Sequence, residues 1–335
     1  MMRPSTRQSS LRASRHRIEA SLAGVLVAAG ALLWVQAPAF FSAGNLLDML
    51  LATLPVLIVA IGATLVILIG EIDISVGSAF AIASVVAGQA AVWQLPMPAV
   101  ALFTVMTGAA IGAVNGGLVA TLRLPSIVVT LATMVALRDG LRWITQGAWV
   151  QNLPPGFQFL GVSQSWYPLV ALGVAAIILA IAAWSLRYLP AGRAVYATGS
   201  SADAARLAGI PVAAARFWVF VIGGACTGLA ALLNAVRFNQ IPSNAGLGLE
   251  MQVIAAVVVG GTAITGGRGT LTGTVLGVAL LGGIGPALTF LSASPYWERA
   301  LQGAIVLIAV GIAARRAPAG VWPLRRPAKG ARVRA

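Results

Sequence analysis

The sequence is poor in the residues that most enzymes use for catalysis. Its 335 residues include a single cysteine, Cys226, a single histidine, His16, and a single lysine, Lys329. One cysteine excludes an internal disulfide. One histidine, placed in a basic N-terminal tail, excludes the HExxH motif and a serine nucleophile with a nearby histidine partner. We therefore expect no catalytic residue, no metal site and no enzymatic activity in this chain.

A phosphate-binding loop is also absent. No GxxxxGK[ST] motif occurs, and the only lysine lies in the C-terminal tail. The glycine-rich stretch 266–269 is instead typical of a tight turn between helices. If ATP drives this protein, a separate ATPase subunit must bind the nucleotide with its magnesium ion, and we expect no cofactor on this chain itself.

Charged residues are scarce as well. They make up 9% of the chain, against roughly a quarter in soluble proteins, and 59% of the residues are hydrophobic. Several apolar runs approach 20 residues, the length that crosses about 30 Å of hydrocarbon. The sequence thus predicts an all-α, polytopic protein of the lipid bilayer with about ten transmembrane helices, at residues 20–40, 48–70, 76–93, 98–120, 126–146, 168–187, 216–236, 250–264, 270–291 and 298–314.

The net charge of +14 follows the topology predicted for a membrane protein and does not indicate binding to nucleic acid. Ten crossings place both tails on one side, and with both termini in the cytoplasm 18 of the 22 basic residues lie on that side. We expect a basic cytoplasmic tail at 1–19, a transmembrane domain at 20–314 and a second basic cytoplasmic tail at 315–335.

One cytoplasmic loop, residues 188–215, is polar and basic between apolar segments. Its centre, residues 200–208, predicts a short helix that Ser200 or Ser201 caps, with Asp203 in its first turn. Gly209 and Pro211 are typical of a helix end. A membrane protein that carries a capped helix in a loop is expected to present it to a partner.

Acidic residues near membrane depth are costly and are often functional. Glu71 and Asp73 lie between apolar runs, but at a spacing of two on a helix they would diverge, so no carboxylate dyad is expected. One interpretation is that Asp73 or Ser75 simply caps the following helix. The other is that Glu71, Asp73, Ser75 and Gly77 belong to a translocation path or gate.

The same two interpretations apply later in the chain. Glu250 falls near the first turn of a helix, where the helix dipole favours a carboxylate, and it is also a candidate for the path or gate. Gly260 and Gly261 belong to a late cluster of glycines. These glycines either allow close helix packing or line a narrow path.

Four blocks of sequence together resemble the permease subunits of bacterial ABC importers for simple sugars, the ribose-type family. Within that family the chain is most similar to the permeases for autoinducer-2 and rhamnose import, because of the stretches ITQGAWVQNLP (144–154) and SPYWE (294–298). The resemblance covers residues 45–313. Its four blocks are GEIDISVGS (70–78), LPSIVVTLATMVALRDG (124–140), ATGSSADAARLAGI (197–210) and GLGLEMQVIAAVVVGGTAITGGRGTLTGTVLG (246–277).

The resemblance implies a machine in the bacterial inner membrane. Two permease subunits, identical or paired with a paralogue, would form the pore, two ATPase domains would bind below it, and a periplasmic solute-binding protein would deliver the sugar. The cytoplasmic helix would then dock in a cleft of the ATPase, where Arg206 could pair with an acidic residue. The residues assigned to this coupling are Ser201, Asp203, Ala204, Ala205, Arg206 and Gly209.

Two alternatives remain open at this point. The branched-chain amino acid permeases share the architecture and differ in the ligand that is delivered. A secondary carrier without an ATPase would need ionisable coupling groups at the midplane, and the central stretches of most predicted helices have none. The leading hypothesis is an ATP-driven importer of a simple sugar or sugar-like molecule, such as rhamnose or autoinducer-2.

Overall fold

The described part of the chain is a bundle of helices. A computed structural model describes residues 6–294 and 296–316, and within them it has no strand, only an isolated bridge between Val150 and Ile241. The elements, in chain order, are α1 (Thr6–Gln36), η1 (Pro38–Phe41), α2 (Ala43–Leu68), α3 (Val76–Val92), α4 (Met97–Thr121), α5 (Ser126–Thr145), η2 (Gln158–Gly161), α6 (Tyr167–Tyr188), α7 (Pro190–Ser200), α8 (Ala202–Leu207), α9 (Val212–Ala235), α10 (Leu249–Val259), α11 (Leu271–Phe290) and α12 (Trp297–Arg316).

Each of the ten expected segments coincides with an α-helix. Six helices of the described part are long and apolar enough to cross a membrane, namely α1, α2, α4, α6, α9 and α11. The helices α3 and α10 are apolar but too short to cross alone. Ten crossings and the cytoplasmic termini remain predictions. The helix α1 begins at Thr6, inside the expected tail 1–19, whereas residues 1–5 and 317–335 lie outside the described residues.

The helix boundaries follow local sequence signals. Thr270 caps α11 through its hydroxyl, which accepts a hydrogen bond from the amide of Gly273 at 3.1 Å. The helices α4, α6 and α7 each have a proline in the first turn, where the missing amide hydrogen has no intrahelical partner in any case. Such signals are local, which is why the sequence predicts these ends well.

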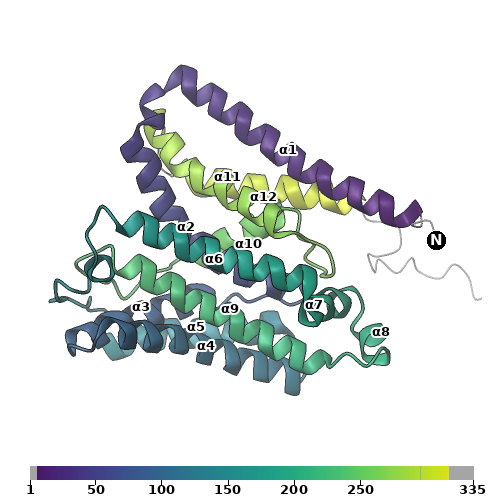
Figure 1. The fold of residues 1–335 in the computed structure, drawn as a ribbon, viewed down its shortest axis with the longest axis horizontal. Coiled ribbons are helices and arrows are strands. Elements are labelled where there is room, and N and C mark those ends of the chain that lie inside the picture. The colour runs from purple at the N-terminus through teal and green to yellow at the C-terminus, as the bar shows by residue number, and fades with distance from the viewer. Residues whose placement is uncertain (1–5, 295, 317–335) are drawn as a thin grey trace, which may run out of the picture.

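The helices pack in layers around α2 and α9. Figure 1 shows α1, α11 and α12 on one side, α3, α4 and α5 on the opposite side, and α2, α6 and α10 between them. The helix α9 contacts α2, α3 and α4, and α2 contacts α9, α10 and α11. The two central helices therefore connect the first half of the bundle to the second.

Small residues allow α4 and α9 to approach each other closely. A Cβ atom on Gly108 would lie 2.7 Å from the amide nitrogen of Gly228, and a Cβ on Gly112 would overlap the carbonyl of Phe220. On the α9 side, a Cβ on Gly224 would overlap the carbonyl of Gly108. These glycines are spaced by four along each helix, which lets the two backbones approach each other closely.

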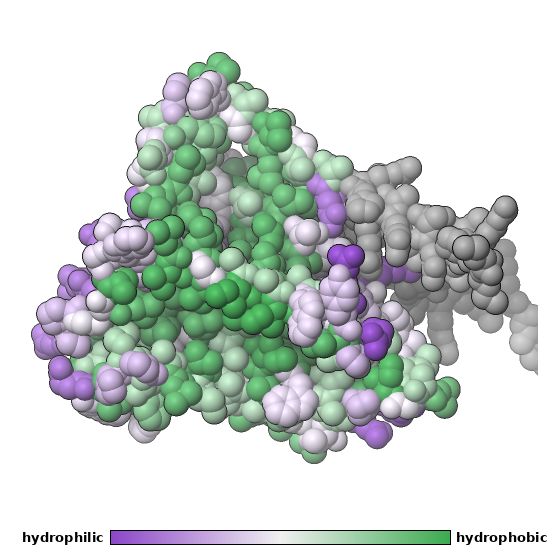
Figure 2. All heavy atoms as spheres, in the orientation of Figure 1, coloured by the Kyte–Doolittle hydropathy of each residue, from purple (hydrophilic) through white to green (hydrophobic). Residues whose placement is uncertain are grey.

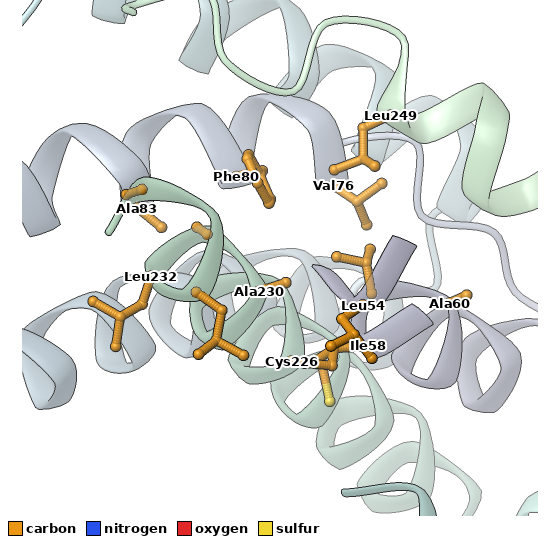
Figure 3. Close-up of a cluster of buried hydrophobic side chains, with 14 of the residues drawn as sticks. Leu54, Ile58, Ala60, Val76, Phe80, Ala83, Cys226, Ala230, Leu232 and Leu249 are labelled. Carbon is orange, nitrogen blue, oxygen red and sulfur yellow. The ribbon is translucent and has the colours of Figure 1, made fainter. Parts of the chain in front are cut away.

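The core lies where α2, α3, α9 and α10 meet. Figure 3 shows Ile58 of α2, Phe80 of α3 and Ala230 of α9 directed into one buried cluster, with Leu249 of α10 at its edge. Cys226 is buried in the same cluster, as its position in an apolar segment predicts. Burying these side chains fixes α3 and α10 beside the central helices.

The outer surface is apolar over its middle. Figure 2 shows hydrophobic residues across the centre of the visible face and hydrophilic ones gathered toward its two ends. Large side chains are exposed on several helices, among them Phe103 of α4, Ile177 of α6 and Trp218 of α9. A soluble monomer rarely exposes an apolar area of this extent, so this distribution favours a surrounding bilayer.

Candidate functional site

The segment between α2 and α3 is unwound inside the bundle. Gly70 adopts a left-handed conformation (φ +87°), and the chain then has no regular secondary structure as far as Ile74. Hydroxyl groups of α5 satisfy its backbone: the amide of Ile72 donates to Ser126 Oγ, and the amide of Ile74 donates to Thr130 Oγ1, both at 3.1 Å. Irregular backbone at membrane depth requires such partners, because lipid supplies none.

Asp73 is buried at the end of this segment and anchors a chain of polar groups. Its Oδ1 accepts hydrogen bonds from the amide of Ser75 at 2.9 Å and from Ser75 Oγ at 2.6 Å. Asn115 of α4 donates to Ser75 Oγ at 2.8 Å, and Thr133 of α5 donates to Asn115 Oδ1 at 2.7 Å. The chain links the start of α3 to α4 and α5, and its internal partners offset the cost of burying an acid.

Glu71 forms an ion pair with a residue of α9, in the second half of the chain. Its Oε1 lies 2.9 Å from Nε of Arg216, in the second turn of α9, and both side chains are largely buried. Asp73 takes different partners, so the two acids form no dyad, as expected. The helical spacing behind that expectation was wrong, however, because the segment between α2 and α3 is not helical.

The capping interpretation is correct only in part. Ser75 occupies the N-cap position of α3 but its side chain accepts no capping hydrogen bond. The Asp73 carboxylate instead binds the Ser75 amide. Asp73 therefore stabilises the start of α3, and it does so from two residues before the cap.

The starts of α3 and α10 meet in the bundle. A Cβ atom on Gly77 would overlap the carboxylate of Glu250 and would lie 2.7 Å from the carbonyl oxygen of Gly246. Glu250 lies in the first turn of α10 and is buried, and its carboxylate is 3.5 Å from Nη2 of Arg138 on α5. The expected position of Glu250 near a helix start is confirmed, and the structure brings it together with Gly77.

The segment before α10 is also irregular. Near the C-terminal end of α3, a Cβ on Gly88 would lie 2.5 Å from Ile241 Cδ1, and at the start of α3 Gly77 contacts Gly246. The segment 241–246 therefore runs along α3 from its end to its start. Gly246 and Gly248 have positive φ angles, +73° and +85°, a conformation that residues with a Cβ atom rarely adopt.

The predicted cytoplasmic helix is α8. It begins at Ala202, because Ser200 ends α7, and Ser201 caps it by accepting a hydrogen bond from the amide of Ala204 at 3.3 Å. Gly209 follows in a left-handed conformation (φ +79°). Capping by Ser201 and termination at Gly209 agree with the sequence prediction, whereas the preceding helix α7 was not predicted.

Most of α8 is exposed. Asp203 and Arg206 form an exposed ion pair at 3.2 Å, and Leu207 is 91% exposed. Ala204 is exposed too, but Ala205 is buried. Ala205 therefore belongs to the attachment of α8, and the remaining candidate coupling residues lie on its free face.

A junction of glycines connects α7 to the unwound segment. A Cβ on Gly199, near the end of α7, would overlap the carbonyl of Leu68 and lie 2.6 Å from the amide nitrogen of Gly267. A Cβ on Gly266 would lie 2.8 Å from Gly70. The amide of Gly267 also donates to Leu68 O at 2.8 Å. The end of α2, the end of α7 and the predicted turn 266–269 thus meet directly before Glu71.

The last two candidates of the path, Gly260 and Gly261, support packing and chain reversal. A Cβ on Gly260 would overlap the carbonyl of Gly273 on α11, and Gly261 has φ +89° at the end of α10. The contact between α10 and α11 explains Gly260, and the left-handed turn that ends α10 explains Gly261. The packing interpretation accounts for them without a path.

Some members of the site were not among the predicted residues. Arg216 was counted only as a topological charge, and its partner is far away in the sequence. Asn115 is a lone amide within the apolar helix α4 and is completely buried, a signal that could have marked it. Among the residues that the structure describes, no group of three or more histidine, cysteine or acidic residues could hold a metal ion.

Comparison with known proteins agrees with this architecture. Residues 45–310 match the family model described as the branched-chain amino acid transport system / permease component. The chain belongs to this permease family. It is a multi-pass protein of the inner membrane. Members of the family are permease components of ABC transporters.

Curated members of this permease family include sugar importers. The chain is 34% identical to the ribose import permease protein of Haemophilus influenzae, over 82% of this chain and 86% of the relative. It is 36% identical to the autoinducer 2 import system permease protein of Enterobacter sp., over 86% and 82%, and 36% identical to that of Yersinia pseudotuberculosis, over 75% and 72%. No solved structure matches the chain.

Proposed function

We propose that this chain is the membrane subunit of an ATP-driven importer that moves a simple sugar or sugar-like molecule, such as rhamnose or autoinducer-2, into the cytoplasm. The relatives named for ribose and autoinducer-2 import support the substrate class, since each is similar over most of both chains. A second permease subunit, identical or paralogous, and a periplasmic solute-binding protein complete the proposed assembly.

The observation that carries the ATP-driven mechanism is the exposed helix α8. The chain has no phosphate-binding loop of its own, so an ATPase must be a separate subunit. The helix α8 offers that subunit a short, capped surface with Asp203, Arg206 and Leu207 exposed. Through α7, this surface is connected to the glycine junction beside Glu71.

The arrangement of the bundle supports a cytoplasmic position for α8. The helix α1 begins at the end of the bundle that carries α7 and α8 (Figure 1), and four of the five basic residues of the predicted N-terminal tail, Arg7, Arg12, Arg15 and Arg17, lie in its first turns. Cytoplasmic loops and tails carry an excess of arginine and lysine. The ATPase would therefore bind at this end, and sugar would arrive at the other.

The coupling role can be tested with a charge reversal on α8. In Arg206→Glu, the exposed pair with Asp203 is lost but no buried contact changes, so the permease should fold normally. We expect the affinity for the ATPase subunit to fall at least tenfold, and ATP-dependent uptake in proteoliposomes to fall with it. The matched control is Arg142→Glu on α5, which disrupts an exposed i,i+3 pair with Asp139 of the same kind.

Two results would contradict the proposal. If Arg206→Glu bound the ATPase and transported as well as the control, α8 would not be the coupling helix. If the permease alone took up sugar without ATPase or nucleotide, the protein would be a secondary carrier.

A further inference from the structure

A cavity lies between α2, α10, α11 and α12. Its volume is about 350 Å³, which lies within the range of small-molecule binding sites. Four side chains with hydrogen-bonding groups line it: Thr53 of α2, Gln252 of α10, Thr289 of α11 and Glu298 of α12. The rest of the lining is apolar or glycine.

Two glycines of α11 make room for the polar groups. A Cβ on Gly282 would overlap the methyl group of Thr53, and a Cβ on Gly285 would lie 3.0 Å from Glu298 Oε2. Glu298 Oε1 accepts a hydrogen bond from Gln302 at 3.2 Å, which holds the carboxylate in position. No ion-pair partner of Glu298 is present among the residues that the structure describes, so its second oxygen remains available to a ligand.

The polar lining indicates that the cavity contains water or a polar ligand. A carboxylate and an amide that faced hydrocarbon would be costly, so such groups in a membrane protein face a protein interior or an aqueous path. Thr53 lies in the first half of α2, and Glu298 lies in the first turn of α12. In the proposed orientation both positions belong to the periplasmic half, where a delivered substrate would enter.

The chemistry of the lining favours one ligand class. A carboxylate, an amide and two hydroxyls can bind the hydroxyl groups of a polyol, and the apolar walls fit its C–H faces. An amino acid would also bring a carboxylate, and the lining holds no arginine or lysine to bind it. An anionic ligand would in addition be repelled by Glu298.

We infer that this cavity is a binding site for a neutral polyhydroxy compound on the transport path, with Glu298 and Gln252 as specificity-determining residues. The inference rests on the proposed sugar-import function and adds to it the place where the sugar is bound. It assigns to α11 the role of shaping the site through Gly282 and Gly285.

The first test does not require the ligand. It measures whether water reaches the cavity. Because Cys226 is the only cysteine and is buried, its alanine variant gives a cysteine-free chain. In that background, Thr53→Cys is compared with Thr107→Cys, whose parent hydroxyl is exposed on the outside of α4. The complete transporter in proteoliposomes is treated with a charged, membrane-impermeant thiol reagent.

We expect the cavity cysteine to react at least tenfold faster than the α4 control, because the reactive thiolate requires water. Ribose or autoinducer-2, supplied with the binding protein, should slow this reaction. Equal or slower labelling of the cavity cysteine would overturn the inference and would mean that lipid or a second copy of the chain fills the space.

The second test measures specificity. Glu298→Gln keeps the shape of the side chain but removes its charge, so the KM for ribose or autoinducer-2 uptake should rise about tenfold at a similar maximal rate. The control is Asp48→Asn, an exposed acid of α2 outside the cavity lining. If the parent imports sugar and Glu298→Gln leaves the KM unchanged, the site assignment is wrong. If the parent imports leucine and neither sugar, the proposed function itself fails.

Discussion

Breaking the ion pair between Arg138 of α5 and Glu250 of α10 should cost far more stability than breaking an exposed pair on α5. The two charges are 3.5 Å apart, with side chains only 22% and 9% exposed. In Glu250→Gln, the Arg138 charge stays in the bundle without its partner. Losing one member of a buried pair costs about 3–5 kcal/mol, and the partial exposure of Arg138 places the expected loss near the lower end, at about 3 kcal/mol.

The chain supplies a matched control for this experiment. Asp139 and Arg142 form a pair of the same kind on α5, at 3.7 Å, but their side chains are 67% and 53% exposed. Exposed pairs of this type contribute about 0–1 kcal/mol. Asp139→Asn should therefore lower the free energy of unfolding by no more than about 1 kcal/mol.

The measurement is equilibrium unfolding of the purified permease in mixed micelles. It is made for Glu250→Gln, for Arg138→Gln and for the double variant that carries both substitutions. We expect the double variant to lose less than the sum of the single losses, because neither charge is then left alone. The reasoning would be refuted if Glu250→Gln cost no more than Asp139→Asn, or if the two single losses were strictly additive.

Three further predictions concern packing, the polar chain and the coupling helix. Gly112→Ala should reduce the free energy of unfolding by about 1–3 kcal/mol, because its Cβ would overlap the α9 backbone. The control Gly117→Ala should cause no such loss, because its Cβ would contact no other atom. Thermal unfolding in detergent checks both variants. Asn115→Leu should lower stability by about 1–3 kcal/mol and reduce uptake, because it leaves the hydroxyls of Ser75 and Thr133 without their shared partner. A melting profile equal to that of the wild type would contradict this prediction. Ser201→Ala should weaken ATPase binding by loosening α8 by about 1 kcal/mol, while Ser201→Asp should retain it, as titration with the ATPase subunit would reveal.

The sequence predicts the helices well because their signals are local. The expected segment 168–187 and the observed α6, Tyr167–Tyr188, differ by one residue at each end. The helix α7 was missed because it contains no long apolar run, and only Pro190 in its first turn marks its start. The cap and the terminating glycine of α8 were predictable because their signals, like those of α6, are local in the sequence.

The candidate site was predictable in its acidic members, not in their partners on other helices. Glu71, Asp73 and Glu250 stand out because acids are rare in this chain. Their partners lie on other helices: Arg216 on α9, Asn115 on α4 by way of Ser75, and Arg138 on α5. Such pairings depend on how the bundle closes, which no local pattern records.

The closing of the bundle also explains why an acid lies where α3 and α10 meet. The starts of both helices converge at Gly77 and Gly246, so that two sets of unpaired amide groups and two positive dipole ends come together away from bulk water. A negative charge at that point lowers the electrostatic energy, and Glu250 supplies it, while Arg138 balances the carboxylate from the third side. Glu250 therefore stabilises the fold itself, and a role in transport would depend on the same charge. A loss of uptake in Glu250→Gln would accordingly demonstrate a role in transport only if a packing variant with a comparable loss of stability, such as Gly112→Ala, retained more uptake.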